Sequence, residues 1–397
     1  MKQSTIRVGL VGSGFVAKFH SLAYNNLALV YNSTLPAVER IRLFDVTTEL
    51  AAEGAAQFGW QEATDDWRNI TRADDIDLVD IVAPNYAHAE IAVDAARHGK
   101  HIFCEKPLAH DVASARQMVE AVFQTGCTHQ VGFVYRMWPA VAFAKELIDT
   151  GKIGRIIHFH SRFLHDYGLD PSLPMSWRFE SQKAGAGSIG DIGSHAIDIG
   201  RYLVGDIVRV FAQSRTFVKK RLIAPPGLSN AFRRGDSEIE QLSEYGTVDV
   251  DDATDMLVEF EDGTMGNFET NWAAAGHENE LSFEVSGERG AIKFSWRHAN
   301  ELLVHSADDP ENLNGFRTVI IGPMHPNAES FGPVPGLGMG YTDAFYIAMR
   351  QMVESISRGK AASPNFIDGL KACEVVDAAV RSSDSGKWEE VNHNPPL

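Results

Sequence analysis

The sequence predicts two domains: an α/β domain with a doubly wound parallel sheet at residues 1–135, and an α+β domain on a large, mostly antiparallel open sheet at residues 136–397. In the first part, short apolar strands alternate with helices of about ten to fifteen residues, which is typical of βαβ units. In the second part, strands follow one another through tight turns, which is typical of an antiparallel sheet. The length of 397 residues agrees with two or three domains.

The elements of the first domain follow from apolar runs that end in turn residues and from helical spacing between them. The expected strands are Ile6–Val11, Ile41–Asp45, Leu78–Ala83, His101–Cys104 and His129–Phe133. The expected helices are Phe15–Leu29, Glu49–Phe58, Ala87–His98 and Val112–Thr125.

The second domain begins with a helix at Pro139–Thr150, an alternating strand at Arg155–Phe163 and a glycine-rich approach to a helix at 185–205. The further strands are Val208–Val218, Met256–Phe260, Thr264–Asn271, Leu281–Ser286, Ala291–Trp296 and Glu301–Val304. Loops are expected at 222–250 and Gly322–Gly340. The closing helices, Asp343–Arg358 and Phe366–Ser383, are able to pack back on the first domain.

Composition narrows the class of partner. The formal net charge is −17, which repels nucleic-acid phosphates and anionic lipid, so we expect neither as a partner. No apolar stretch is long enough to span a membrane, and the N-terminus lacks a signal-peptide pattern, so we expect a soluble, cytoplasmic protein. Cys104, Cys127 and Cys373 are too widely spaced for a disulfide framework or a metal knuckle.

A dinucleotide-binding turn is predicted at Gly12-Ser13-Gly14-Phe15-Val16-Ala17, directly after the first strand. Gly12 permits the tight turn, Gly14 lets the backbone approach a pyrophosphate, and the N–H groups of Phe15 and Val16 open the helix whose dipole favours phosphate. Asp45 ends the second strand, where an acidic residue holds the ribose hydroxyls. Its charge would repel a 2′-phosphate, so NAD is favoured over NADP. Asp45 lies further along the chain than this acidic residue usually does, and residues 32–39 are expected to form a longer loop that accounts for the difference. The alternative for Asp45 is a solvated carboxylate at a strand end.

Three further motifs occur in a characteristic order. They are Ala83-Pro84-Asn85-Tyr86-Ala87-His88, Glu105-Lys106-Pro107 and Gly190-Asp191-Ile192-Gly193-Ser194-His195. With these motifs the chain resembles the glucose–fructose oxidoreductase/inositol dehydrogenase/MocA (Gfo/Idh/MocA) family over its whole length. The resemblance implies a Rossmann domain that binds NAD, a sugar or cyclitol substrate, and a homodimer or homotetramer. It also implies cofactor contacts from Ala83, Pro84, Asn85, His88, Glu105 and Lys106, and a cis bond before Pro107.

Within that family the chain is most similar to the levoglucosan dehydrogenase subgroup. The similar stretches are His20–Tyr24, Ser176–Phe179, Val248–Asp252, Gly315–Val319 and Gly322–Pro326. The chemistry that this similarity implies is oxidation of a secondary alcohol of a pyranose ring, at carbon 3 for levoglucosan, with NAD as acceptor.

The catalytic candidates are Lys106, Asp191 and His195. Oxidation of an alcohol needs a base for the hydroxyl proton and a stabiliser for the developing alkoxide. His195 is the expected base, Asp191 would orient the imidazole or the substrate hydroxyl from one turn earlier on a helix, and Lys106 would supply positive charge. The alternatives are a surface lysine and a helix pair without a role. No metal is expected, because Asp191 and His195 lack a third ligand and His158 with His160 read as ordinary sheet residues.

Candidate substrate contacts follow the fifth strand and the first strand of the second domain. A sugar site combines aromatic faces with polar side chains that bind hydroxyls. The candidates are Tyr135, Arg136, His165, Trp177, Arg178 and Tyr341. Core packing is the alternative for Trp177.

The expected function is NAD-dependent oxidation of a secondary hydroxyl of a pyranose sugar, an anhydrosugar or a cyclitol to a ketone. One alternative is a glycoside hydrolase that uses NAD for transient oxidation of the sugar. The other is a regulator that senses sugar or NAD without catalysis, which the presence of all three catalytic candidates disfavours.

Overall fold

A parallel sheet of six strands forms the first half of the fold in the computed structural model, which describes residues 5–32, 35–224 and 243–393. The strand order is β3-β2-β1-β4-β5-β6, and every pair is parallel. Because the order reverses between β1 and β4, a crevice opens at the carboxyl ends of these strands, where such sheets bind ligands. The strands are β1 (Thr5–Val11), β2 (Ala37–Phe44), β3 (Glu62–Thr64), β4 (Leu78–Ile81), β5 (His101–Cys104) and β6 (His129–Val131).

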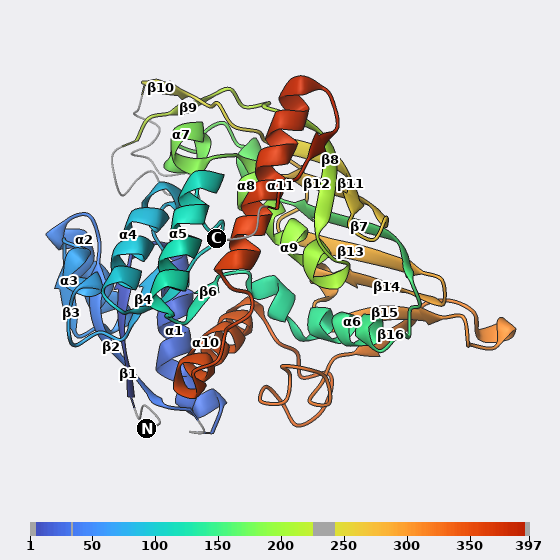
Figure 1. The fold of residues 1–397 in the computed structure, drawn as a ribbon, viewed down its shortest axis with the longest axis horizontal. Coiled ribbons are helices and arrows are strands. Elements are labelled where there is room, and N and C mark those ends of the chain that lie inside the picture. Colours follow the sequence, from blue (N-terminus) through green and yellow to red (C-terminus); the bar gives the residue numbers. More distant parts are fainter. Residues whose placement is uncertain (1–4, 33–34, 225–242, 394–397) are drawn as a thin grey trace.

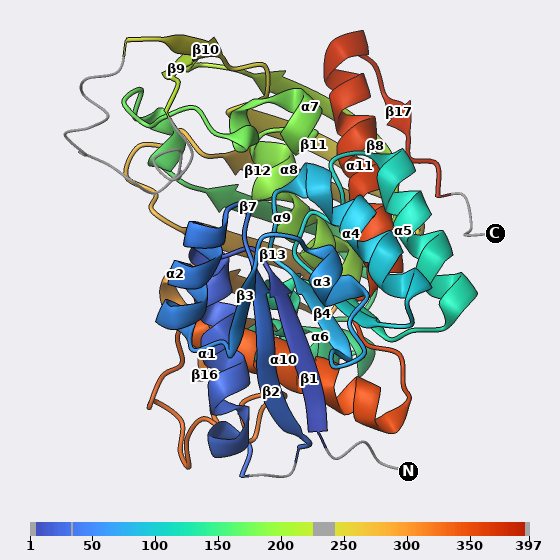
Figure 2. The same cartoon turned by 90° about the vertical axis from the view of Figure 1, so that its left-hand side faces the viewer.

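Helices cover both faces of this sheet (Figure 2). Thr47 and Asp111 cap α2 and α5 through their side chains, and Gly59 and Gly126 end the same helices in the left-handed conformation. These local signals explain why the sequence predicts α2 and α5 within a residue of their ends. The helices are α1 (Phe15–Val30), α2 (Thr48–Phe58), α3 (Arg68–Thr71), α4 (Asn85–Arg97) and α5 (Val112–Thr125).

A nine-stranded sheet forms the second half, in the order β16-β15-β14-β13-β7-β12-β11-β8-β17. Only β7 and β12 pair in parallel, and all other described pairs are antiparallel. The strands are β7 (Ile156–Leu164), β8 (Ile207–Arg215), β11 (Ala253–Phe260), β12 (Met265–Asn271), β13 (Glu280–Gly287), β14 (Gly290–Ser295), β15 (Glu301–Ser306), β16 (Arg317–Ile320) and β17 (Glu389–Glu390). The predicted fold class is confirmed.

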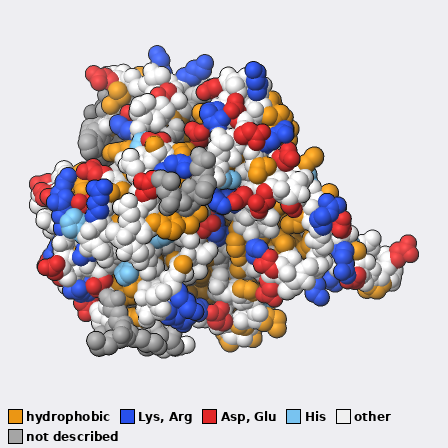
Figure 3. Space-filling view, in the orientation of Figure 1, with side chains coloured by type: hydrophobic (Ala, Val, Ile, Leu, Met, Phe, Trp, Pro, Cys, Tyr) orange, Lys and Arg blue, Asp and Glu red, His pale blue; other side chains and the backbone are white. Residues whose placement is uncertain are grey.

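One face of the large sheet packs against helices α6 (Pro139–Asp149), α8 (Ser188–Asp191) and α9 (Gly193–Leu203) (Figure 1). The close approach of α9 requires Gly200, because a Cβ there would lie 2.7 Å from the ring of Phe268. On the opposite face, Leu257 and Met265 are more than half exposed, with His158 and His160 between other polar residues. On the side shown in Figure 3, acidic and basic side chains are interspersed over the described surface.

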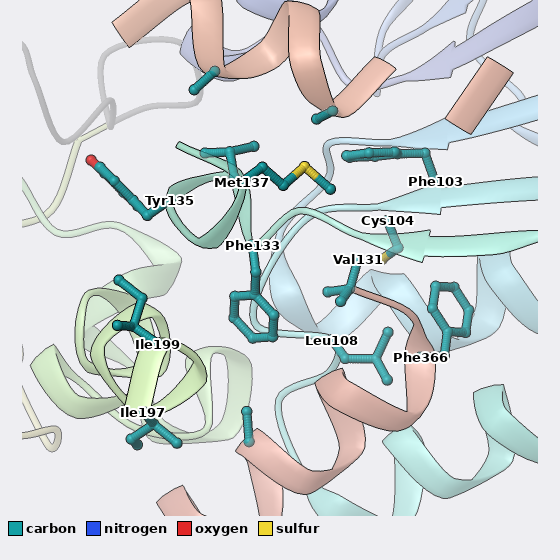
Figure 4. Packing of buried hydrophobic residues seen from close by; sticks show 14 of the residues in the cluster. Phe103, Cys104, Leu108, Val131, Phe133, Tyr135, Met137, Ile197, Ile199 and Phe366 are labelled. Atoms are coloured by element: carbon teal, nitrogen blue, oxygen red, sulfur yellow. The ribbon is translucent and has the colours of Figure 1, made fainter. Parts of the chain in front are cut away.

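The last two helices, α10 (Tyr341–Arg358) and α11 (Phe366–Ser385), join both halves. α10 packs on α1, where the rings of Phe19 and Phe345 stack with centroids 5.4 Å apart. α11 lies between α5 and β8, with an ion pair from Glu374 to Arg116. Figure 4 shows the apolar core at this junction, where side chains of the first sheet meet those of α9 and Phe366 of α11.

Several elements differ from the sequence-based expectation. β3, α3, β16 and β17 were not predicted, because two to four residues carry too little periodicity. β2 begins at Ala37, so part of the long loop expected at 32–39 is strand. The predicted loop at 222–250 contains β10 (Tyr245–Thr247), which pairs with β9 (Lys220–Leu222) at the start of the loop, while residues 225–242 lie outside the described residues. In the described part of the chain, none of the helices has the length and apolarity to cross a membrane.

Candidate active site

The turn between β1 and α1 has the geometry that a pyrophosphate requires. Gly12 has φ +113°, and a Cβ at this position would lie 2.9 Å from the carbonyl oxygen of Val82. Gly14 is the N-cap residue of α1, so no side chain caps this helix. A Cβ at Gly14 would meet no atom within 4 Å. The space beside Gly14 is therefore open, which lets a phosphate approach the start of α1.

Asp45 lies directly after β2 and is fixed against this turn. Its Oδ2 accepts hydrogen bonds from the Ser13 N–H at 3.0 Å and from the Ser13 hydroxyl, and its Oδ1 accepts from the Val46 N–H at 2.7 Å. These bonds hold a carboxylate beside the glycine turn, as a contact to ribose hydroxyls requires.

Side chains of the motif at residues 83–88 form hydrogen bonds that hold the loop at Pro107 in place. The ring of His88 is fully buried, with Nε2 at 2.8 Å from the Ala83 carbonyl oxygen and Nδ1 at 3.1 Å from that of Pro107. Burial lowers the pKa of His88, so the ring is neutral at pH 7 and donates to only one of these two carbonyls. Asn85 donates to the carbonyl of Ala184 at 3.1 Å. The Lys106–Pro107 peptide bond is cis. The structure thus places His88 and Asn85 where they join loops together.

A cavity of about 270 Å³ lies beside the turn between β1 and α1, lined by residues of α1 and α10, of the segments that follow β5 and β6, and of the second half of the fold. Its size is just below the usual range of about 300–1,000 Å³ for small-molecule sites. It brings together ten of the predicted site residues: Phe15, Val16, Glu105, Lys106, Tyr135, His165, Arg178, Asp191, His195 and Tyr341.

Lys106 and Asp191 form an ion pair in the wall of the cavity. The Lys106 Nζ lies 2.7 Å from Asp191 Oδ1 and donates to the Asp191 carbonyl at 3.0 Å. Oδ2 accepts from the Tyr167 hydroxyl at 3.1 Å and lies 3.8 Å from Arg178 Nε. Burial alone would raise the pKa of Asp191, but the charges of Lys106 and Arg178 and these hydrogen bonds hold it below its usual range. Asp191 is therefore an anion that fixes the lysine ammonium.

His195 lies in the first turn of α9 and is enclosed by aromatic rings. The centroid of Tyr135 is 4.7 Å away, and those of Phe133 and Phe163 are 5.9 and 6.1 Å away. Burial and the nearby charge of Lys106 lower the pKa of His195 well below its usual value. Its Nδ1 is buried and has no hydrogen-bond partner among the described residues. His195 is thus a neutral imidazole able to accept a proton.

The expected helix pair of Asp191 and His195 is corrected by the structure. Asp191 ends α8 and His195 belongs to α9, with a break at Ile192. The carboxylate is bound by Lys106 and Tyr167, so the geometry assigns Asp191 to the lysine rather than to the imidazole.

Two predicted contact residues lie outside the cavity lining. Arg136 is buried and paired with Asp198 on α9, 3.3 Å from Asp368, so its charge is already neutralised. Trp177 stacks on the guanidinium of Arg178 at 4.4 Å. Arg136 is therefore paired away from the cavity, whereas the contact predicted for Trp177 stays a prediction. Among the described residues, no group of three or more His, Cys, Asp or Glu is arranged to hold a metal ion.

The cavity lining includes seven further residues, and two of them, Tyr167 and Asn279, have polar side chains. Tyr167 follows His165 in the same loop, and its proximity to that candidate was the available signal. Asn279 belongs to no motif. Its amide group lines the cavity, and an amide can both donate to and accept from a hydroxyl.

Comparison with known proteins agrees with this geometry. Residues 6–133 match an oxidoreductase family with an NAD-binding Rossmann fold, and residues 141–293 match the GFO/IDH/MocA C-terminal domain. Levoglucosan dehydrogenase of Pseudarthrobacter phenanthrenivorans is 40% identical over 388 residues, 97% of this chain and 98% of the relative. The scyllo-inositol 2-dehydrogenase (NAD(+)) of Bacillus subtilis is 27% identical over 383 residues, 96% of this chain and 95% of the relative.

Solved structures show the same architecture. The apo form of levoglucosan dehydrogenase superimposes with a TM-score of 0.94 at 39% identity, covering 99% of this chain and 100% of that one. Its complex with NADH and levoglucosan gives 0.91, covering 98% of this chain and all of that one. The resemblance that the motifs indicate is confirmed, and so is NAD as the cofactor: the chain belongs to the GFO/IDH/MocA family of NAD-dependent oxidoreductases.

Proposed function

We propose that this enzyme oxidises a secondary hydroxyl of a pyranose sugar, an anhydrosugar or a cyclitol to a ketone. Levoglucosan, oxidised at carbon 3, is the first substrate to test. The observation that carries the proposal is the cavity in which a neutral His195 and an ion-paired Lys106 lie beside the dinucleotide turn. A base and a cation next to the cofactor are the groups that dehydrogenation of an alcohol needs.

The cofactor would be held by Gly12, Gly14, Phe15 and Val16 at the pyrophosphate and by Asp45 at the ribose. Glu105 and Lys106 line the cavity into which its reactive end would project. NAD, when bound, accepts the hydride from the carbinol carbon. His195 takes the hydroxyl proton, while the Lys106 ammonium donates a hydrogen bond to the oxygen as negative charge develops on it. Asp191 keeps that ammonium in place.

The lining of the cavity suits a polyhydroxylated ring. Tyr135, Phe163 and Tyr341 offer aromatic faces for C–H surfaces. His165, Arg178 and Asn279 offer polar groups for hydroxyls. The names of the relatives point the same way, since one is a levoglucosan dehydrogenase and another an inositol dehydrogenase.

A screen of levoglucosan, glucose, glucosides, other anhydrosugars and inositols tests the proposal. The expected result is accumulation of NADH with at least one of these compounds and loss of it in Lys106→Ala. Release of free sugar from a glucoside without net NADH would instead support redox-assisted hydrolysis. Binding of NAD and sugar without turnover of either kind would support a sensing role. Either result would contradict the proposed dehydrogenase.

We also propose a homodimer or homotetramer formed through the open face of the nine-stranded sheet. Leu257 and Met265 are 52% and 65% exposed on that face, and burial of such side chains against a second copy would be favourable. Analytical ultracentrifugation tests this assembly.

The proposed location is the cytoplasm, in agreement with three free cysteines. The proposed domain boundary lies near residue 135, just after β6.

A further inference from the structure

A buried histidine outside the catalytic set bridges two carboxylates beneath the active-site loop. His20 lies on α1, its side chain is 0% exposed, and its ring packs near those of Phe103 and Phe345. Its Nδ1 lies 2.8 Å from Asp80 Oδ2 on β4, and its Nε2 lies 3.1 Å from Glu105 Oε1 directly after β5. His20 opens the stretch His20–Tyr24 that is similar to the levoglucosan dehydrogenase subgroup, but that similarity assigns it no role, so its role needs a separate argument.

Only the charged form of the ring donates a hydrogen bond to both carboxylates. A neutral imidazole has one N–H and one lone pair, so it donates to only one of two carboxylates. An imidazolium donates to both and supplies the positive charge that buried carboxylates need. Burial by itself would lower the pKa of His20, but Asp80 and Glu105 raise it to about 9. The ring is therefore an imidazolium at pH 7.

The bridge reaches the catalytic lysine through Glu105. While Oε1 of Glu105 faces His20, its Oε2 accepts from the Lys106 N–H at 3.1 Å. The space for this carboxylate depends on Gly132, because a Cβ there would lie 2.6 Å from Oε1. Glu105 is thus fixed on both oxygens, and the residue that follows it carries the ammonium bound to Asp191.

We propose that His20 is a positioning residue for the reaction: its imidazolium holds the Glu105 carboxylate, and through it the backbone of Lys106, in the place from which the ammonium reaches the substrate oxygen. His20 also ties this loop to α1, whose first turn forms the phosphate site. The inference rests on the proposed function only where turnover is measured, because the charge of His20 and its bond to Glu105 can be tested without substrate.

The substrate-independent test is NMR of the full chain labelled with ¹⁵N-histidine. The expected spectrum at pH 8 contains one imidazole with both nitrogens protonated, which is missing in His20→Gln and changes in Glu105→Gln. A neutral ring at position 20 at pH 7 would overturn the proposal, whatever the substrate of the enzyme is.

The kinetic test compares His20→Gln with Ser21→Ala. Ser21 is the next residue on α1, and its buried hydroxyl accepts from Trp60 Nε1 at 2.9 Å, away from the cavity. His20→Gln should lower kcat about tenfold or more, with the KM for sugar and the Kd for NAD changed less than about threefold. Ser21→Ala should lower the melting temperature and keep kcat. Equal loss of kcat in both variants, or none in His20→Gln, would overturn the positioning role.

A double-mutant cycle tests whether the effect passes through Glu105. If it does, adding His20→Gln to Glu105→Gln should lower kcat by less than about threefold, although the same change in the wild type costs about tenfold. Fully additive losses would overturn the coupling. If no sugar or cyclitol is oxidised by the wild type, the proposed function fails, while the NMR result still decides the state of His20.

Discussion

Replacement of Asp191 by Asn separates the charge of this residue from its shape. In the wild type the carboxylate receives the Lys106 ammonium at 2.7 Å, and the two side chains are only 22% and 16% exposed. An amide oxygen at the same place still accepts this hydrogen bond, but without the charge. Hydrogen bonds to ionised partners contribute about 1.5–3 kcal/mol and neutral ones about 1 kcal/mol, so the lysine loses roughly 0.5–2 kcal/mol of positioning energy. At 1.36 kcal/mol per tenfold, kcat should fall about 2- to 30-fold.

The same substitution should change the pH profile. The charge of Asp191 raises the pKa of His195, while burial and Lys106 lower it. Oxidation needs the neutral imidazole, so the rate rises with pH through the pKa of this coupled group, which we expect below 6.5. Without the Asp191 anion the imidazolium is less stable, and the rising limb should move to lower pH.

The assay is NADH absorbance against pH for the wild type, Asp191→Asn and Tyr167→Phe. Tyr167→Phe removes the 3.1 Å hydrogen bond to the same carboxylate but leaves its charge, so its limb should stay in place. Thermal unfolding of all three variants controls for loss of fold. A rate for Asp191→Asn within twofold of the wild type and an unmoved limb would refute the reasoning and make Asp191 a purely structural residue.

Three further predictions follow from the site. Asp45 should make kcat/KM with NAD at least about tenfold higher than with NADP, roughly 1.4 kcal/mol, and Asp45→Ala should reduce this preference; equal efficiency with both cofactors in the wild type would exclude Asp45 from ribose binding. Lys106→Ala and His195→Ala should each lower kcat by about 10² to 10⁴ while the Kd for NAD, measured by fluorescence titration, changes little; a variant that keeps most of its activity loses its assigned role. Gly132→Ala should destabilise the fold by about 1–3 kcal/mol in urea unfolding, because its Cβ would collide with Glu105. The control Gly340→Ala, whose Cβ meets no atom within 4 Å, should change the stability little. Similar effects of both substitutions would show that the Glu105 side chain moves aside freely.

The parts of the site that the sequence predicts are those in which partners lie close together along the chain. The glycine turn is one example, since strand, turn and helix are contiguous and the residues from Gly12 to Ala17 carry the whole signal. Asp45 is another, because the apolar run before it identifies a strand end. In both places the backbone geometry agrees with the expectation.

Pairing between distant residues could not be predicted in the same way. Lys106 and Asp191 are 85 residues apart, and the motifs show that both matter without showing that they touch. The helix break at Ile192 also has no local signal, and it turns Asp191 toward the lysine. Asn279 enters the cavity from the position before β13, which no motif marks, and Tyr167 enters it from the loop that carries His165.

Arg136 and His20 show why the roles of buried charged residues could not be predicted from the sequence. Arg136 follows β6, where a substrate contact is expected, but its guanidinium is neutralised by Asp198, 62 residues away on α9. His20 belongs to a stretch that is similar to the family subgroup, but the sequence assigns it no partner, because its partners lie 60 and 85 residues away on β4 and after β5. A buried charged side chain needs an oppositely charged partner nearby. Its role therefore depends on the position of that ion pair relative to the active-site cavity. Paired behind the cavity, Arg136 is unavailable to a ligand, whereas His20 is paired with a carboxylate that also holds the backbone of the catalytic lysine.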